Sequence, residues 1–149
     1  MRKPAAAPAD VSWALPGPRL LSDAEVRAVV SAALAHGGRP QLHVAVVFAS
    51  DAELARLHGQ HLADPSPTDV LAFDLGERGA GPAGELYVSV ERARAEARSR
   101  GLAPEGELAL YLVHGCLHLC GHDDRRPRAR ARMRAAERAV LLRLGYASG

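Results

Sequence analysis

The sequence contains no uninterrupted apolar run approaching the roughly 18 residues that a membrane-spanning helix requires. Its first residues, MRKPAAAPAD, include basic side chains but lack the apolar stretch of a secretory signal peptide. We therefore expect a cytoplasmic protein with no membrane partner. The length of 149 residues fits one domain with a substantial core.

Cysteine is also scarce. The two cysteines, Cys116 and Cys120, lie four positions apart in a segment with a helical pattern, where side chains one turn apart do not reach disulfide geometry. Without a secretory signal, we expect both thiols to be reduced and buried.

Lysine occurs once, at Lys3, so the positive charge is almost entirely arginine. Residues 1–124 carry 11 basic against 16 acidic side chains, whereas residues 125–149 carry eight arginines against one acid, Glu137. This asymmetry, in a chain of net charge +2, indicates a polyanionic partner for the C-terminal segment.

The order of the predicted elements indicates the fold class. Serine followed three residues later by glutamate predicts helix starts at Ser22 and Ser50. Glycines end the first helix near 36–38, and prolines make 64–67 a loop after the second. The expected strands are 42–48, 68–73 and 85–90, and the expected later helices are about 91–100, 105–120 and 128–144.

Residues 1–20 are rich in proline, alanine and glycine, and we expect a flexible tail with at most one short strand near 11–15. Residues 21–149 are expected to form a single domain. Strands alternating with helices at first, then adjacent strands followed by helices, predict an α+β fold with a small mixed sheet of about four strands.

The residues able to do chemistry lie in the stretch 114–124, which reads HGCLHLCGHDD. His114 and His118 are four apart on a predicted helix, so their side chains point the same way. An isolated pair with this spacing is more often solvated or hydrogen-bonded than metal-bound. Here the helix is otherwise apolar and offers no acid on the same turn, and burying two unpaired imidazoles is costly. This context favours a bound metal ion.

A third ligand is expected just beyond Gly121, where a left-handed turn can bring the chain back over the same helix face. The candidates are His122, Asp123 and Asp124. Cys116 and Cys120 each follow a histidine by two residues, about 200° around the helix, so they are expected to face the core. Two histidines and one carboxylate leave a fourth position open, which is typical of catalytic zinc.

Two common classes of zinc enzyme are disfavoured. The residue after the first histidine is Gly115, not the glutamate base of the HExxH proteases. The H-x-E and P-C-x-x-C pattern of zinc deaminases is also missing.

Arginine occupies six of the ten positions 125–134. Such a run is most often a solvated helix face, but these residues alternate along the chain and only Glu137 offers a nearby acid. Guanidinium groups bind phosphate well as bidentate donors. We therefore expect Arg125, Arg126 and Arg128 to contact a nucleic acid.

Three blocks of the sequence are similar to the YbeY family of metal-dependent endoribonucleases. The family signature H-G-x-L-H-L-x-G-Y-D-H corresponds to 114–124, and the family block P-T-D-V-L-S-F corresponds to PTDVLAF at 67–73. A glycine-acid strand start corresponds to GELYVS at 84–89. The blocks occur in the family's order, and the resemblance covers about residues 42–145.

The resemblance implies a zincin-like mixed four-stranded sheet with helices, and one zinc ion bound at three histidine positions. The first two positions are His114 and His118, and the third falls on Asp124, an acceptable zinc ligand. His122 stands at the family's tyrosine position and is the alternative ligand. A family arginine falls on Leu62, so this chain lacks that group or uses another arginine.

The resemblance further implies a single-strand endoribonuclease that matures the 3′ end of small-subunit ribosomal RNA and takes part in ribosome quality control. An activated water would attack the phosphodiester while arginines hold the backbone, and Asp69 is a candidate general base that could equally belong to a structural turn. Two alternatives stay open: a zinc hydrolase of peptides or small molecules, and a non-catalytic RNA-binding ribosome-assembly factor.

Overall fold

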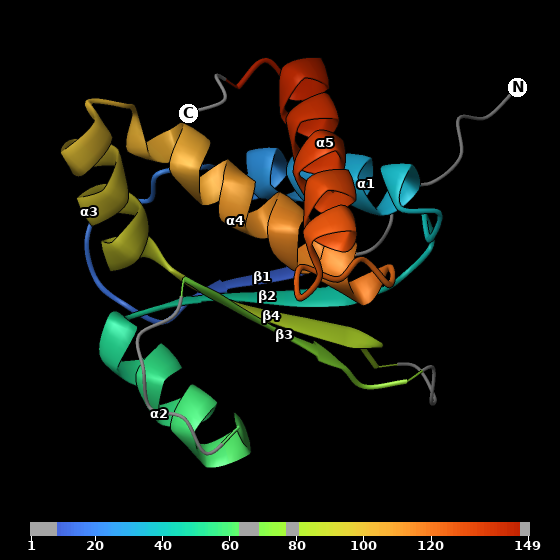
Figure 1. Ribbon diagram of the computed structural model, residues 1–149. Coiled ribbons are helices and arrows are strands. Elements are labelled where there is room, and N and C mark those ends of the chain that lie inside the picture. Colours follow the sequence, from blue (N-terminus) through green and yellow to red (C-terminus); the bar gives the residue numbers. More distant parts are fainter. Residues whose placement is uncertain (1–8, 63–68, 77–80, 147–149) are drawn as a thin grey trace, which may run out of the picture.

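The computed structural model describes residues 9–62, 69–76 and 81–146. Its centre is a four-stranded sheet in the order β1-β2-β4-β3 (Figure 1). The strands are β1 (Ala9–Trp13), β2 (Val44–Ala49), β3 (Val70–Asp74) and β4 (Gly84–Ser89). The first, second and fourth strands are parallel, and β3 pairs antiparallel with β4 at one edge. The predicted α+β class with a small mixed sheet is confirmed.

Helices cover the two faces of the sheet unequally. The helices are α1 (Asp23–His36), α2 (Asp51–Leu62), α3 (Val90–Arg100), α4 (Pro104–Leu119) and α5 (Pro127–Leu144). Figure 1 shows α1, α3, α4 and α5 on one side of the sheet and α2 alone on the other. Helix α5 lies outside α1 and α4 and contacts both. Among the described residues, no helix combines the length and apolar character needed to cross a membrane.

The first capping box forms as its sequence pattern predicts. Ser22 Oγ accepts the Glu25 N–H at 3.0 Å, and the Glu25 carboxylate accepts the Ser22 N–H at 2.9 Å. Only one of the two hydrogen bonds of the second capping box forms among the described residues. Ser50 Oγ accepts the Glu53 N–H, but the Glu53 carboxylate pairs with Arg56 instead of the Ser50 backbone. Both helices nevertheless begin where the pattern indicates, since one satisfied backbone donor suffices to mark the start.

The short strand allowed near 11–15 lies at 9–13 and forms the outer parallel strand of the sheet. It is anchored by Trp13, whose ring stacks on Phe48 at 3.9 Å and whose Nε1 donates to Asp23 at 3.0 Å. An aromatic stack over a fully buried ring stabilises this edge. The loop expected at 64–67 lies outside the described residues.

Helix α4 packs closely against the sheet at Gly115, which lies between the two histidines. A Cβ at this position would lie 2.7 Å from Leu86 Cδ2 and 3.1 Å from Val70 Cγ2. Leu86 is fully buried, so it has little room to yield. Glycine at 115 therefore sets the distance between the histidine turn of α4 and strands β3 and β4.

We expect Gly115→Ala to lower the free energy of unfolding by about 1 kcal/mol. The added methyl group overpacks the core at a cost of about 1–3 kcal/mol, which exceeds the roughly 1 kcal/mol by which alanine is favoured over glycine inside a helix. In a Leu86→Val background, where the obstructing methyl is gone, the same substitution should cost nothing or stabilise. Chemical denaturation of the two single variants and the double variant measures this coupling. Equal costs in both backgrounds would contradict the close contact.

Candidate metal centre

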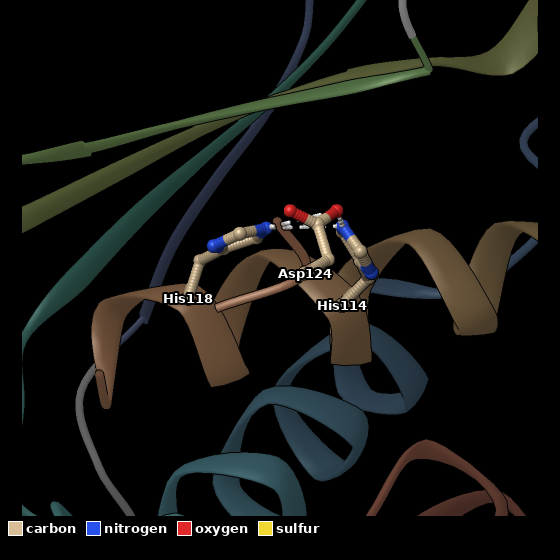
Figure 2. Close-up of side chains that lie close together, drawn as sticks. All are labelled: His114, His118 and Asp124. Carbon is tan, nitrogen blue, oxygen red and sulfur yellow. Dashed lines mark hydrogen bonds and ion pairs between the residues drawn. The ribbon is translucent and has the colours of Figure 1, made fainter. Parts of the chain in front are cut away.

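Two imidazoles of α4 are directed at one point. The Nε2 atoms of His114 and His118 are 3.2 Å apart, and the two rings are inclined by 76°. Figure 2 shows both rings rising from the same side of the helix. The opposite side of α4 is buried in the core, through residues such as Leu112 and Cys116, so the helix cannot rotate to separate the pair.

Asp124 completes the group from the loop after α4. Cys120 caps the helix, and Gly121 reverses the chain with a φ of +98°, a conformation that glycine adopts without steric cost. The Asp124 Oδ2 atom lies 3.7 Å from His114 Nε2 and 3.8 Å from His118 Nε2. One ligand atom from each residue falls within 4.8 Å of the others, so this group could hold a metal ion.

The other two residues considered as ligands, His122 and Asp123, are not part of this group. The His122 backbone N–H donates to the Leu117 carbonyl, and the Asp123 carboxylate accepts the Arg125 N–H at 2.9 Å. In the described parts of the chain, the side chains that could hold a metal ion include neither of these residues.

The cysteines also point away from the histidines, as their helical positions predict. Cys116 is fully buried, and burial raises the pKa of its thiol. Cys120 was expected to be buried but is half-buried. Its side chain packs against the end of α1, where its Sγ lies 2.5 Å from the place that a Cβ on Gly37 would take. Both cysteines are free.

Glu137 of α5 is a site residue that the sequence analysis did not identify. Its Oε2 lies 2.5 Å from His114 Nδ1, and its side chain is 13% exposed. An imidazole that donates Nδ1–H to a carboxylate presents the lone pair of Nε2, here toward His118 and Asp124. The only sequence signal was a lone acid in an arginine-rich segment, and nothing in the spacing placed it beside His114.

The two histidines differ in pKa. Burial acts to lower the pKa of His114, but the hydrogen bond and the charge of Glu137 outweigh it and raise this pKa above its ordinary value. Burial and the neighbouring charge of His114 lower the pKa of His118. His118 thus favours the neutral form that binds metals, whereas a proton competes with a metal for His114.

A cleft of about 470 Å³ opens in front of the group. Strand β3 forms one wall through Val70, Ala72 and neighbouring residues, and α4 forms the other around Gly115. Asp69 lines this cleft, so the structure brings the candidate general base to the same space as the histidines. An edge strand beside an open cleft leaves room for an extended ligand.

The three arginines expected to contact RNA have different positions. Arg125 lines the cleft with a side chain that is 89% exposed. Arg126 is also exposed and occupies the N-cap position of α5 without a side-chain capping hydrogen bond. Arg128 is exposed in the first turn of α5, about half a turn around the helix from Glu137. Leu62 is the last residue of α2, and its side chain lies outside the described residues.

Comparison with known proteins decides the family. The family described as Endoribonuclease YbeY matches residues 20–145. The chain belongs to the YbeY family. A relative of this family from Rhodopirellula baltica, described as Endoribonuclease YbeY, is 38% identical over 123 residues, which are 81% of this chain and 63% of the relative.

Two other relatives carry the same description. The protein from Deinococcus radiodurans is 37% identical over 66% of this chain and 66% of its own length, and the protein from Myxococcus xanthus is 35% identical over 67% and 36%. The chain thus spans less than two thirds of the length of each of these relatives. The solution structure of TM1509 from Thermotoga maritima matches the fold with a TM-score of 0.60 at 25% identity, covering 91% of this chain and 90% of that one.

Replacing Glu137 tests whether its carboxylate positions His114. Hydrogen-bond partners behind metal-bound histidines typically contribute about 10–100-fold to metal affinity, so we expect a loss of that order in Glu137→Ala at mildly alkaline pH. Glu137→Gln should lose less, because its amide oxygen can still accept the Nδ1–H bond. Competition with a chromophoric chelator measures both affinities, and Glu53→Ala on α2 is the control for lost charge.

The pH dependence of metal binding should shift as well. Glu137 raises the pKa of His114, so His114 stays protonated, and unable to bind a metal, up to a higher pH in the original protein than in either variant. Relative to its own maximum, metal binding by Glu137→Ala should therefore persist to lower pH. An unchanged midpoint and affinity would show that Glu137 only joins two helices.

Proposed function

We propose that this protein is a zinc-dependent single-strand endoribonuclease that acts in the cytoplasm. Its substrate would be the 3′ end of small-subunit ribosomal RNA, with a further role in ribosome quality control. The observation that carries the proposal is the convergence of His114, His118 and Asp124 at one end of an open cleft, in a chain of the YbeY family.

The distances within the group suit zinc. With Zn–N bonds of about 2.0–2.1 Å and tetrahedral angles, two nitrogen ligands lie about 3.3 Å apart. The two Nε2 atoms are 3.2 Å apart, and the Asp124 oxygen needs to move only a few tenths of an ångström closer than its 3.7 and 3.8 Å. Three protein ligands are fewer than the four of a structural zinc site, and the three residues line an open cleft, which supports a catalytic site.

The chain's own residues would divide the work of the reaction. Glu137 holds His114 in the tautomer whose Nε2 can bind the metal, and Asp69 lies in the cleft where it could accept a proton from the attacking water. When bound, zinc would lower the pKa of a water molecule and withdraw charge from a phosphate oxygen.

We also propose that arginines after the metal centre hold the RNA backbone. Arg125 in the cleft and Arg126 beside it would bind phosphates directly, as bidentate donors. Arg128, which is farther around α5, would add long-range attraction within the screening length of about 8–10 Å. In this proposal, Arg125 takes the place of the family arginine that Leu62 replaces.

Two other functions remain as competing hypotheses. A zinc hydrolase of peptides or small molecules would use the same three ligands, but it gives the arginines of 125–134 no role. A ribosome-assembly factor that binds RNA without cutting it would need only a structural metal. The open cleft beside the group supports catalysis over this alternative.

Metal content tests the ligand set. We expect about one zinc ion per purified chain, its loss in Asp124→Ala, and its retention in His122→Ala, because the Asp124 carboxylate lies close to both Nε2 atoms. Asp124→His should also retain zinc, since histidine bonds zinc at a similar length. Elemental analysis of the four folded proteins gives the answer. Loss of zinc in the His122 variant alone would replace Asp124 by His122 as ligand.

RNA cleavage tests the function itself. Purified protein should cut labelled single-stranded ribosomal RNA, lose this activity with a chelator and regain it with added zinc. His114→Ala should be inactive while keeping its circular dichroism spectrum, because its ring lines the cleft and lies outside the buried core. Cleavage of peptides but not RNA would favour the first competing hypothesis. A variant that loses its fold together with RNA binding would favour the second.

A further inference from the structure

Glu137 identifies the side of α5 that borders the metal centre. Its carboxylate contacts His114, so the part of the helix surface around it faces the histidines. On a helix, Arg134 and Arg130 precede Glu137 by three and seven residues and lie within about 60° of it. They continue that side toward the start of α5, by about 4.5 and 10.5 Å along the axis. Arg125, in the cleft, lies just before that start.

Other arginines of α5 lie on a different side. Arg132 and Arg143 are about 120–140° from Glu137 in the opposite rotational sense, and both are exposed. The arginines that alternate along the chain therefore lie on two different sides of one helix. The buried residues Met133 and Val140 fix this orientation, because they hold α5 against α1 and α4.

Arg130 and Arg134 have no acidic partner among the residues that the structure describes. Glu137 is the only acid in 125–149, and His114 occupies it. The backbone positions of Arg130 and Arg134 are about 6 Å apart along the helix axis, and both side chains are exposed. Like charges this close along one helix side repel each other, and a chain of phosphates relieves that repulsion. A small or uncharged substrate of the cleft would not reach them.

We infer that single-stranded RNA leaving the cleft runs along the Glu137 side of α5, with its phosphates bound by Arg130 and Arg134. Arg132 and Arg143 contribute only long-range attraction. This inference rests on the proposed function, because the strand is taken to start at the metal centre. Under this inference, α5 determines the direction in which the RNA leaves the cleft.

Two double variants with equal loss of charge test it. The zinc-loaded protein, Arg130→Gln/Arg134→Gln and Arg132→Gln/Arg143→Gln are titrated against a fluorescent 2′-O-methyl single-stranded RNA, which prevents cleavage, at several salt concentrations. For the first double variant we expect about 10-fold weaker binding and a salt slope reduced by about 1.4, from two lost contacts at about 0.7 each. The second should lose about 2-fold or less and keep its slope.

The outcomes separate this inference from the proposed function. Equal losses in both double variants would overturn the inference, since they would reflect net charge alone, and would leave RNA binding intact. No binding of RNA by the unmodified protein would overturn both. Binding to anionic lipid vesicles with the same dependence on Arg130 and Arg134, in place of RNA, would overturn the assignment to RNA.

Discussion

The contact between α4 and the sheet at Gly115 sets the geometry of the rest of the site. Because glycine has no side chain, the helix packs directly against Leu86 and Val70 at this position. The two histidines on either side of Gly115 therefore lie beside the edge strand of the sheet. His114 and His118 consequently reach the cleft beside β3, while most of the other residues of α4 are buried. Close packing converts a spacing in the sequence into a fixed position in space.

The electrostatics of the centre depend on charges from three segments. Burial and the neighbouring charge of His114 lower the pKa of His118, His114 is hydrogen-bonded to Glu137, and Asp124 brings a carboxylate from the loop. A carboxylate ligand makes a zinc site less positive than three imidazoles would. The arginines that follow at once in the chain offer positive charge near the same place, which suits a substrate made of phosphates.

Membership of the YbeY family accounts for the fold, whereas the particular residues of this chain bear on the properties of its site. The family match and the shared fold agree with one another over most of the chain. The aspartate at 124, the leucine at 62 and the arginines of α5 are features of this chain itself. In the proposed function, they would affect how tightly the metal is bound and where the backbone of the substrate lies, rather than the type of fold.

Much of the fold followed from local patterns. The capping serine at Ser22, the apolar strands and the four-residue spacing of the histidines each act within a few residues, and each formed as expected. The resemblance in three blocks led to the family, and helical periodicity turned the cysteines away from the histidines. Tertiary structure alone decided that Glu137 would contact His114 and that Asp69 would line the same cleft. Those outcomes depend on how α5 packs across α4 and how β3 closes the sheet, and contacts between distant segments leave no periodic trace in the sequence.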